Sequence, residues 1–316
     1  MDNEMESLID NNTFTKVPRS EASNVKEVGG RWVYSIKDGG NDTELFKARY
    51  VAKGYSQIYG LDYFETFAPT AKLTSLRILF QIAAQENLVI HQMDVKSAYL
   101  NAPIDVKIYL EQPKGYTDED FVWLLNKSIY GLKQSGRQWN AVIHKFFINH
   151  KFKRSEVDAC VYFFRMGNGV IIILIWVDDI ILASNLVEYL NKTKNLLKRH
   201  FKMKDLGPIS NFLGIHVVQT PNVVELDQSN YLLKLLIRFG MIESKPRYTP
   251  CEKNPSAFST NTEIQPESCK KYREIVGSLI YLMTCTRPDL SWVVTKLSQH
   301  LDSPDSADWI MLDHVI

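Results

Sequence analysis

An apolar run that is broken by two adjacent carboxylates constrains the fold of this chain more than any other feature. Residues 170–177 are apolar apart from their tryptophan ring nitrogen, Asp178-Asp179 follow, and residues 180–183 are apolar again. Burying strands on both sides of two acids is costly unless a positive group lies beside them, and neighbouring carboxylates repel each other. A divalent cation removes both costs, so one interpretation is a hairpin whose tip presents two aspartates to Mg²⁺. The other is an ordinary polar turn between two buried strands.

The composition is that of an ordinary globular protein. The 316 residues are 45% hydrophobic and 23% charged, with a net charge of +1, so any basic surface for nucleic acid must be local. The cysteines form no close pair, which indicates neither a zinc site nor a disulfide framework. The acidic N-terminus lacks the apolar segment of a signal peptide, and the 170–183 run is too short to cross a bilayer. We therefore expect a cytoplasmic protein without a membrane partner.

Periodicity predicts a mixture of helices and strands. Helices are expected at the N-terminus and over residues 74–88, 138–152, 186–201, 231–239, 272–284 and 290–301. Strands are expected over residues 31–53, as a hairpin turning at Gly39-Gly40-Asn41-Asp42, and over 88–95, 106–110, 160–164 and 170–177. This irregular order favours an α+β fold in which helices pack on one face of an antiparallel sheet.

The second strand of the 31–53 hairpin carries its cations on one side. Lys47, Arg49 and Lys53 share a face by the period-two rule, and an apolar face lies behind them. This arrangement suits a surface that contacts phosphates, although a solvated strand face has the same pattern. The lysines of the 186–201 helix are interpreted as a solvated helix face.

A third carboxylate, Asp94, ends an apolar strand over residues 89–95. Asp94 together with Asp178 and Asp179 gives three carboxylates from two strands. This is the ligand supply wanted by two Mg²⁺ ions that span a phosphoryl displacement, and Mg²⁺ prefers few carboxylates completed by water and substrate phosphates.

Many short segments now match one family in the expected order. The chain resembles the reverse transcriptase of copia-type LTR retrotransposons, a part of their Pol polyprotein, over nearly its whole length. The matching segments are residues 4–8, 47–57, 64–69, 92–101, 128–135, 176–179, 204–207, 212–215 and 276–282.

The resemblance implies a right-hand polymerase fold with fingers, a palm built on an antiparallel sheet, and a thumb. It implies a reverse transcriptase region over residues 1–245 and a truncated helical connection segment over 269–316, leading to an RNase H domain that the sequence does not contain. Residues 246–268 are expected to be a linker, because they are rich in Pro, Ser, Thr and Asn.

The resemblance also implies roles for the acidic residues. Asp94, Asp178 and Asp179 match the catalytic metal ligands of the family, and the backbone carbonyl of Val95 is a further candidate ligand. They would hold two Mg²⁺ ions, for which Mn²⁺ is a substitute.

Several other residues are implied in nucleotide binding. Arg49 and Lys53 are candidates for the triphosphate or the template backbone, and Gly131 and Gln134 lie in a segment that lines the nucleotide. Tyr99 stands where the family excludes a ribose 2′-hydroxyl, or it is a core aromatic residue. Either Lys202 or Lys204 could protonate the pyrophosphate leaving group.

The implied function is RNA-directed DNA polymerisation, in which a DNA primer on an RNA or DNA template is extended with dNTPs. Its implied partners include the remaining Pol domains, RNase H and integrase, in a cytoplasmic virus-like particle. Trp176 replaces the usual Tyr and Gly136 the usual Pro, which leaves open a catalytically decayed or co-opted nucleic-acid-binding relic. A different Mg²⁺-dependent phosphotransferase is a weaker alternative, because no P-loop motif is present.

Overall fold

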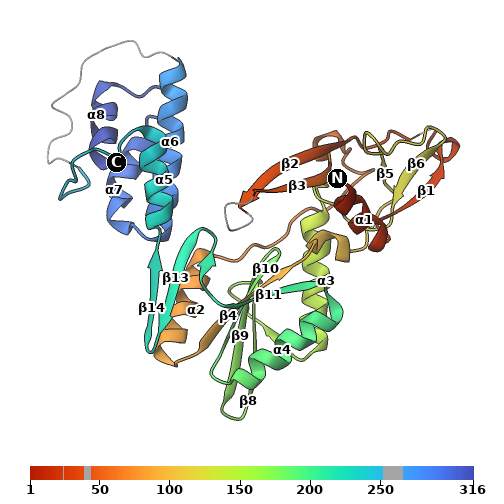
Figure 1. Cartoon of the computed structure of the whole chain (residues 1–316), viewed down its shortest axis with the longest axis horizontal. Helices are drawn as coiled ribbons and strands as arrows, with labels where there is room; N and C mark the ends of the chain where they lie inside the picture. Colours follow the sequence, from red (N-terminus) through yellow and green to blue (C-terminus); the bar gives the residue numbers. More distant parts are fainter. Residues whose placement is uncertain (24, 39–43, 252–265) are drawn as a thin grey trace. The chain divides into compact units, whose positions relative to one another are not determined.

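The computed structural model describes residues 1–23, 25–38, 44–251 and 266–316 (Figure 1). These residues form two compact units, Met1–Pro208 and Ile209–Ile316, which we call unit 1 and unit 2. Within the described ranges, no helix combines the length and apolarity that a bilayer crossing requires.

Helices and strands follow one another in irregular order along the described residues. The helices are α1 (Asp2–Asp10), α2 (Leu73–Gln85), α3 (Ser135–Asn149), α4 (Val187–His200), α5 (Ser229–Phe239), α6 (Pro266–Cys285), α7 (Ser291–Ser298) and α8 (Ser306–Val315). The strands are β1 (Phe14–Pro18), β2 (Gly30–Asp38), β3 (Glu44–Ala52), β4 (Val89–Val95), β5 (Tyr109–Leu110), β6 (Phe121–Leu125), β7 (Lys153–Arg154), β8 (Val161–Met166), β9 (Gly169–Trp176), β10 (Asp179–Ser184), β11 (Met203–Pro208), β12 (Asn211–Phe212), β13 (Ile215–Thr220) and β14 (Val223–Asp227).

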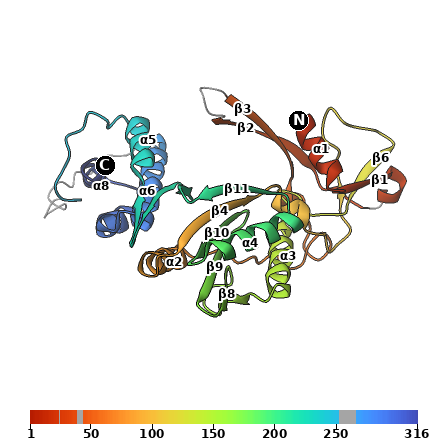
Figure 2. The ribbon, with the colours of Figure 1, turned by 60° about the horizontal axis from the view of Figure 1, so that its bottom comes forward.

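A six-stranded antiparallel sheet forms the centre of unit 1. Its strand order is β11-β4-β10-β9-β8-β7. Alternate residues of β4, β9 and β10, such as Met93, Ile173 and Leu182, point into one hydrophobic cluster with α3 and α4. Figure 2 shows α3 and α4 beside these strands. The apolar run of the sequence therefore forms the two central strands, and its acids lie at the turn between them.

The opposite face of this sheet is also covered. Ile181 and Ala183 of β10 are fully buried but lie outside the α3–α4 cluster, and α2 contacts β10. The α+β class is confirmed, but the expectation that helices pack on only one face is wrong. The cause is β10 itself, which is apolar at both alternating sets of positions.

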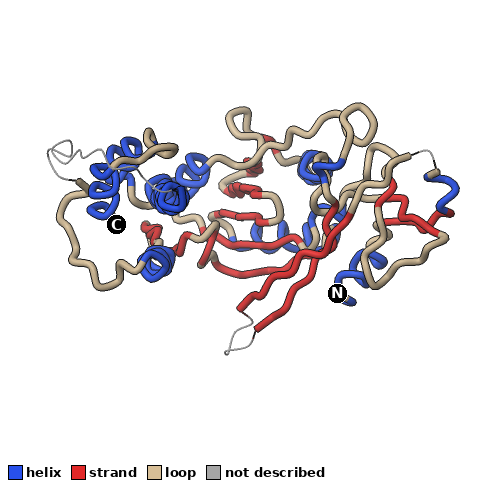
Figure 3. Tube along the Cα trace, turned by 90° about the horizontal axis from the view of Figure 1, so that it is seen from above, coloured by secondary structure: helices blue, strands red, loops and turns tan. Residues whose placement is uncertain are grey.

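The predicted hairpin over residues 31–53 is present as β2 and β3, which Figure 3 shows as a two-stranded ribbon. Its predicted turn, residues 39–42, lies outside the described residues. Tyr50 and Ala52 of β3 are buried against Trp123 of β6 and against α1. The small sheet β1-β6-β5 was largely missed: the predicted 106–110 strand shrinks to Tyr109–Leu110, and β1 pairs with β6 across more than one hundred residues.

Unit 2 combines the small sheet β12-β13-β14 with a helical cluster. Leu235 of α5 shares one core with residues of α6, α7 and α8, among them Tyr272 and Leu312. Residues from the predicted segments 1–245 and 269–316 thus share one hydrophobic core. Most of the predicted linker, residues 252–265, lies outside the described residues, and α6 already begins at Pro266. The division into fingers, palm, thumb and connection segment stays a prediction.

One lysine of the predicted solvated helix face is buried. Lys194 of α4 donates to Asp205 of β11 at 2.8 Å and contacts the Nδ1 atom of His91 on β4. Lys198 donates to the same aspartate at 2.9 Å. Burial alone would raise the pKa of Asp205, but the two lysine hydrogen bonds together hold it well below its ordinary value. The interpretation as a solvated face is therefore wrong for Lys194, which joins α4 to both strands.

This contact makes the sheet sensitive to pH. Burial and the neighbouring Lys194 lower the pKa of His91 below 6.5, so the stabilisation is complete above pH 6.5 and is lost as pH falls toward the lowered pKa. We expect hydrogen exchange to show weaker protection of β4 and β11 at pH 5.5 than at pH 7.5. His91→Gln, which can still accept from Lys194 but cannot titrate, should show a smaller change, and His216→Gln in unit 2 should behave as wild type. Equal pH dependence in wild type and His91→Gln would contradict this account.

Candidate active site

The turn between β9 and β10 is tight and strained. Trp176 and Asp179 pair across the two strands, which leaves only Val177 and Asp178 in the loop. Val177 has a φ of 58°. A β-branched side chain is rarely found in this left-handed region, where a hairpin of this length normally has glycine. Such a conformation persists only where its surroundings hold it.

Two neighbouring elements hold this turn through its carbonyl groups. The indole N–H of Trp139, on α3, donates to the carbonyl of Val177 at 2.7 Å. The backbone N–H of Val95, at the end of β4, donates to the carbonyl of Asp178 at 2.8 Å. Trp139 is fully buried. The helix and the neighbouring strand therefore fix the tip of the hairpin, and the sequence analysis assigned no such role to Trp139.

The antiparallel register brings two of the predicted carboxylates face to face. Asp179 of β10 pairs directly with Asp94 of β4, so their side chains share one face of the sheet. Buried Gln92, two residues before Asp94 on that face, donates from Nε2 to Asp179 Oδ1 at 3.1 Å. Gln92 was missed, although its period-two relation to Asp94 is visible in the sequence.

The third predicted carboxylate, Asp178, acts on the pKa values of two tyrosines. Burial raises the pKa of Tyr99, and the Asp178 carboxylate raises it further. Burial also raises the pKa of Tyr130, to about 12, where Asp178 again acts in the same direction and Arg49 opposes it. Asp178, Tyr99 and Tyr130 thus lie within electrostatic reach of one another. Asp178 itself is partly exposed.

The described residues contain no group of three or more His, Cys, Asp or Glu side chains already arranged to hold a metal ion. What the structure brings together is the Asp94–Asp179 pair with Asp178 next to it in the turn. Mg²⁺ is commonly bound by one or two carboxylates together with substrate phosphates. The oxygen donors present fit that pattern without a preformed cage.

The cations of the predicted site lie at different places. The Arg49 guanidinium stacks over the Tyr130 ring, with its Cζ atom 4.6 Å from the ring centroid. Lys53 passes beside Gly29: its Cδ atom lies 3.0 Å from the position that a Gly29 Cβ would take. Arg49 is therefore near the tyrosines of the site, whereas Lys53 lies against Gly29, just before β2.

The two candidate proton donors are now distinguishable. Lys204 of β11 pairs in register with Asp94, so it shares a face with the Asp94–Asp179 pair. Lys202 lies two residues earlier, with its Nζ atom 3.8 Å from Asp10 of α1. Both side chains are exposed. The register favours Lys204.

Comparisons with known proteins identify the family of this chain. Residues 11–253 match the family of reverse transcriptases, described as RNA-dependent DNA polymerases. The chain belongs to this family. It is 37% identical to the retrovirus-related Pol polyprotein from transposon RE2 of Arabidopsis thaliana, over 100% of this chain and 22% of that polyprotein. It is 36% identical to that from transposon TNT 1-94 of Nicotiana tabacum, over 98% of this chain and 24% of the polyprotein. The chain thus spans under a quarter of the length of these relatives.

Its fold is similar to that of a viral reverse transcriptase. The foamy viral protease-reverse transcriptase, solved in complex with double-stranded DNA, superposes with a TM-score of 0.53 and 15% identity, over 98% of this chain and 46% of that one. At this identity the likeness supports the fold alone. The predicted resemblance and the reverse transcriptase fold are confirmed.

Two predicted nucleotide-binding residues of this reverse transcriptase domain have clear packing roles. Gly131 has a φ of 94°, and a Cβ there would lie 2.1 Å from the carbonyl oxygen of Ala52. Gln134 is buried, accepts from Gln57 at 3.1 Å and donates to the carbonyl of Asp62 at 2.8 Å. The Gly131 contact holds the segment 131–134 against β3, and the Gln134 hydrogen bonds hold it against the loop before α2. Direct contact of either residue with a nucleotide stays a prediction.

The two departures from the usual family sequence lie close to the turn. Trp176 pairs with Asp179 across the hairpin. Gly136 lies in the first turn of α3, where a Cβ would come 3.3 Å from that of Ala68. The helix starts at Ser135, whose hydroxyl donates to the carbonyl of Ile129 at 2.6 Å, rather than at the predicted residue 138. A clean helix start therefore does not depend on proline at 136.

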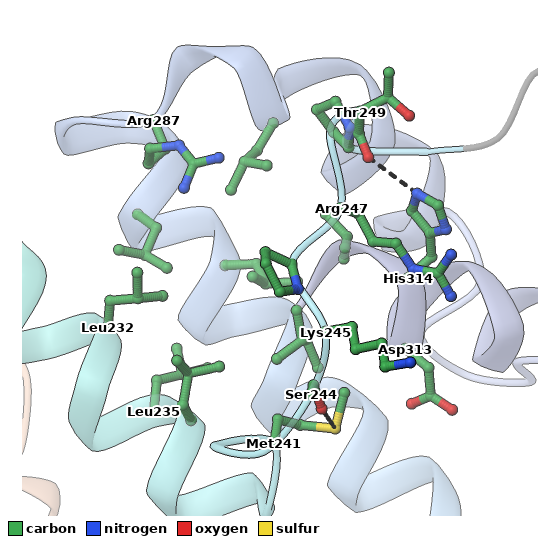
Figure 4. Close-up of a pocket in the computed structure, with 18 of the residues that line it drawn as sticks. Leu232, Leu235, Met241, Ser244, Lys245, Arg247, Thr249, Arg287, Asp313 and His314 are labelled. Atoms are coloured by element: carbon green, nitrogen blue, oxygen red, sulfur yellow. Dashed lines mark hydrogen bonds between the residues drawn. The ribbon is translucent and has the colours of Figure 1, made fainter.

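Unit 2 contains a pocket of about 570 Å³ between α5, α6 and α8 (Figure 4). Leucines such as Leu232 and Leu235 line one side, and His314 contacts the carbonyl of Thr249 at 2.9 Å. Of the two acids in the lining, Asp289 is bound by Arg287 at 2.7 Å. The pocket therefore has no counterpart of the Asp94–Asp179 pair.

The packing role of Gly131 can be tested with a matched glycine. Gly115 has the same φ of 94°, but nothing lies within 4 Å of its absent Cβ. We expect Gly115→Ala to cost about 1 kcal/mol of unfolding free energy, from the left-handed backbone alone, and Gly131→Ala to cost about 3 kcal/mol or more because it also overpacks. Urea denaturation followed by tryptophan fluorescence would measure both. Equal costs would show that the Ala52 contact does not matter.

Proposed function

We propose that this chain acts as an RNA-directed DNA polymerase that extends a DNA primer with dNTPs. The observation that carries the proposal is the register of Asp179 with Asp94, beside Asp178 in a turn held by Trp139 and Val95. Carboxylates fixed by sheet register, rather than by mobile loops, suit a reaction that depends on positioning. Membership of the reverse transcriptase family supports the same reaction.

Asp94, Asp178 and Asp179 would hold two Mg²⁺ ions, or Mn²⁺ in their place, and the carbonyl of Val95 is a further candidate ligand. When bound, such ions make the primer 3′-hydroxyl more acidic and neutralise charge on the triphosphate. Gln92 orients Asp179 through its hydrogen bond, which is the usual way in which a neighbouring group fixes a metal-binding carboxylate.

Other residues of the site would bind and select the nucleotide. Arg49 and Lys53 would contact the triphosphate or the template backbone. The ring of Tyr99 would exclude a ribose 2′-hydroxyl by contact. Lys204, which faces the Asp94–Asp179 pair, would donate a proton to the pyrophosphate leaving group.

The partners follow from the relatives. Foamy viral protease-reverse transcriptase has been solved with double-stranded DNA and with an RNA/DNA hybrid, so we propose an RNA or DNA template with its primer as the nucleic acid bound here. Because the relatives are Pol polyproteins, we propose that the RNase H and integrase regions act with this chain, in the cytoplasm within a virus-like particle.

A second candidate function is a catalytically decayed or co-opted nucleic-acid-binding protein with the same fold. The observation that favours it is Trp176, which lies directly across from Asp179. Its indole is larger than the usual tyrosine and has only one N–H donor. It would then crowd the primer terminus.

Primer extension on poly(rA)/oligo(dT) separates the two functions. We expect Mg²⁺-dependent extension by wild type that stops with EDTA and resumes with Mg²⁺ or Mn²⁺. Asp94→Asn and Asp178→Asn should each lower the rate by roughly three orders of magnitude, because each removes charge that the reaction needs. Glu243→Gln, an exposed acid of unit 2, should have wild-type activity.

The same assay also tests whether the protein is a catalytically decayed enzyme. Activity that appears only in Trp176→Tyr would favour a decayed enzyme, and activity that survives Asp178→Asn would rule out the proposed role of the carboxylates.

The two lysines give a paired test of proton donation. We expect Lys204→Met to lower kcat for dTTP on the order of 100-fold, because it removes the donor that faces Asp94. Lys202→Met should change kcat less than about 3-fold, since that side chain points toward Asp10. Single-turnover incorporation, measured from pH 6 to 9, would check both. The reverse order of effects would assign the proton to Lys202.

A further inference from the structure

Tyr130 lies at the centre of the predicted nucleotide site, and the function proposed above gives it no role. Its carbonyl accepts the N–H of Ala52 at 2.9 Å, which fixes its backbone at the end of β3. Its side chain is half-buried. Gly131 follows it with a positive φ and close packing on Ala52. The position of the Tyr130 ring is therefore set by the fold and not by a mobile loop.

One contact of this ring is with the arginine predicted to bind the triphosphate. The Arg49 Cζ atom lies 4.6 Å from the Tyr130 centroid, within the range of a cation–π interaction. Glu4 of α1 contacts β3, the strand that carries Arg49, since its Oε1 atom accepts the N–H of Tyr50 at 3.3 Å. Burial raises the pKa of Glu4, and Arg49 opposes that rise. Arg49 is thus held by the Tyr130 ring, with the Glu4 carboxyl group on the neighbouring helix close enough to be influenced by its charge.

Another contact of the ring is with the residue predicted to select the sugar. The Tyr99 and Tyr130 centroids are 4.7 Å apart with an interplanar angle of 62°, an edge-to-face arrangement. Tyr99 also packs against the core cluster of the central sheet. Without Tyr130, Tyr99 would lose the support on this side and could turn away from the nucleotide.

We infer that Tyr130 is a positioning residue that couples triphosphate binding to sugar selection by holding Arg49 and Tyr99 at once. The inference rests on the proposed polymerase function. It requires the aromatic ring and not the hydroxyl, because both contacts are made by the ring. Phenylalanine should therefore replace Tyr130, whereas leucine, which has no π face, should not.

The test compares Tyr130→Phe, Tyr130→Leu and a control, Tyr63→Leu. Tyr63 is also a tyrosine with a cation over its ring, Lys133 at 5.4 Å, but its aromatic partner is Tyr59 rather than Tyr99, and Arg49 stacks on Tyr130 instead. Single-nucleotide incorporation would give kcat and KM for dTTP and for UTP. Binding of dTTP to a complex with a dideoxy-terminated primer would be measured separately by tryptophan quenching, and thermal melting would confirm that each variant is folded.

We expect Tyr130→Leu to raise KM and Kd for dTTP about 10-fold, with kcat changed less than about 3-fold. Discrimination of dTTP over UTP should fall by a similar factor. Tyr130→Phe and Tyr63→Leu should remain within about 3-fold of wild type. Loss of kcat alone in Tyr130→Leu, or equal defects in Tyr130→Phe and Tyr130→Leu, would overturn the inference.

The binding measurement distinguishes the inference from the proposed function. A wild type that binds dTTP but does not extend the primer, with weaker binding in Tyr130→Leu, would overturn the proposed activity and support the role of Tyr130. A wild type that extends normally and is unaffected by Tyr130→Leu would do the reverse. A wild type that does neither would overturn both.

Discussion

The constraint on which the site depends is the two-residue turn at Val177 and Asp178. A β-branched residue at φ 58° is unfavourable by itself, so the turn exists because Trp139 and Val95 bind its two carbonyl groups. These bonds also fix the position of the hairpin tip along β4. A slip of one residue would move Asp179 of β10 to the opposite face of the sheet. The strained turn and the register of the acids are therefore parts of one arrangement.

The register of the edge strand β11 positions the lysine of the site in the same way. Lys204 faces Asp94 only while β11 keeps its register with β4, and an irregularity between Asp205 and Gly207 interrupts that register two residues away. The buried Lys194 joins Asp205 to His91 of β4 close to this irregularity. The helix α4 thus stabilises an edge strand whose one neighbour in the described sheet is β4.

The sequence predicted the central elements well because their signals are local. The acid-broken apolar run, the helices 74–88 and 186–201, and the 31–53 hairpin follow from periodicity and turn residues within a few positions. The β1–β6 pairing was missed because it joins residues 14 and 125, and no local pattern records such a partner. In the site, the three aspartates were predicted from charge in an apolar context. Trp139, Gln92 and Tyr130 make contacts between elements. Gln92 left only its period-two relation to Asp94 as a signal, and Trp139 and Tyr130 look like ordinary aromatic residues in the sequence.

The core of unit 2 bears on how such chains can be divided. Leu235 of α5 is buried by residues of α6 to α8, beyond the stretch at 246–251 that has no helix or strand. A protease cut in that stretch would leave both pieces associated, because the core and not the chain connection holds them. A gene rearrangement that separated them would instead expose leucines on each side and favour aggregation. Selection for folding alone would therefore keep the coding sequences of α5 and of α6 to α8 together in one gene.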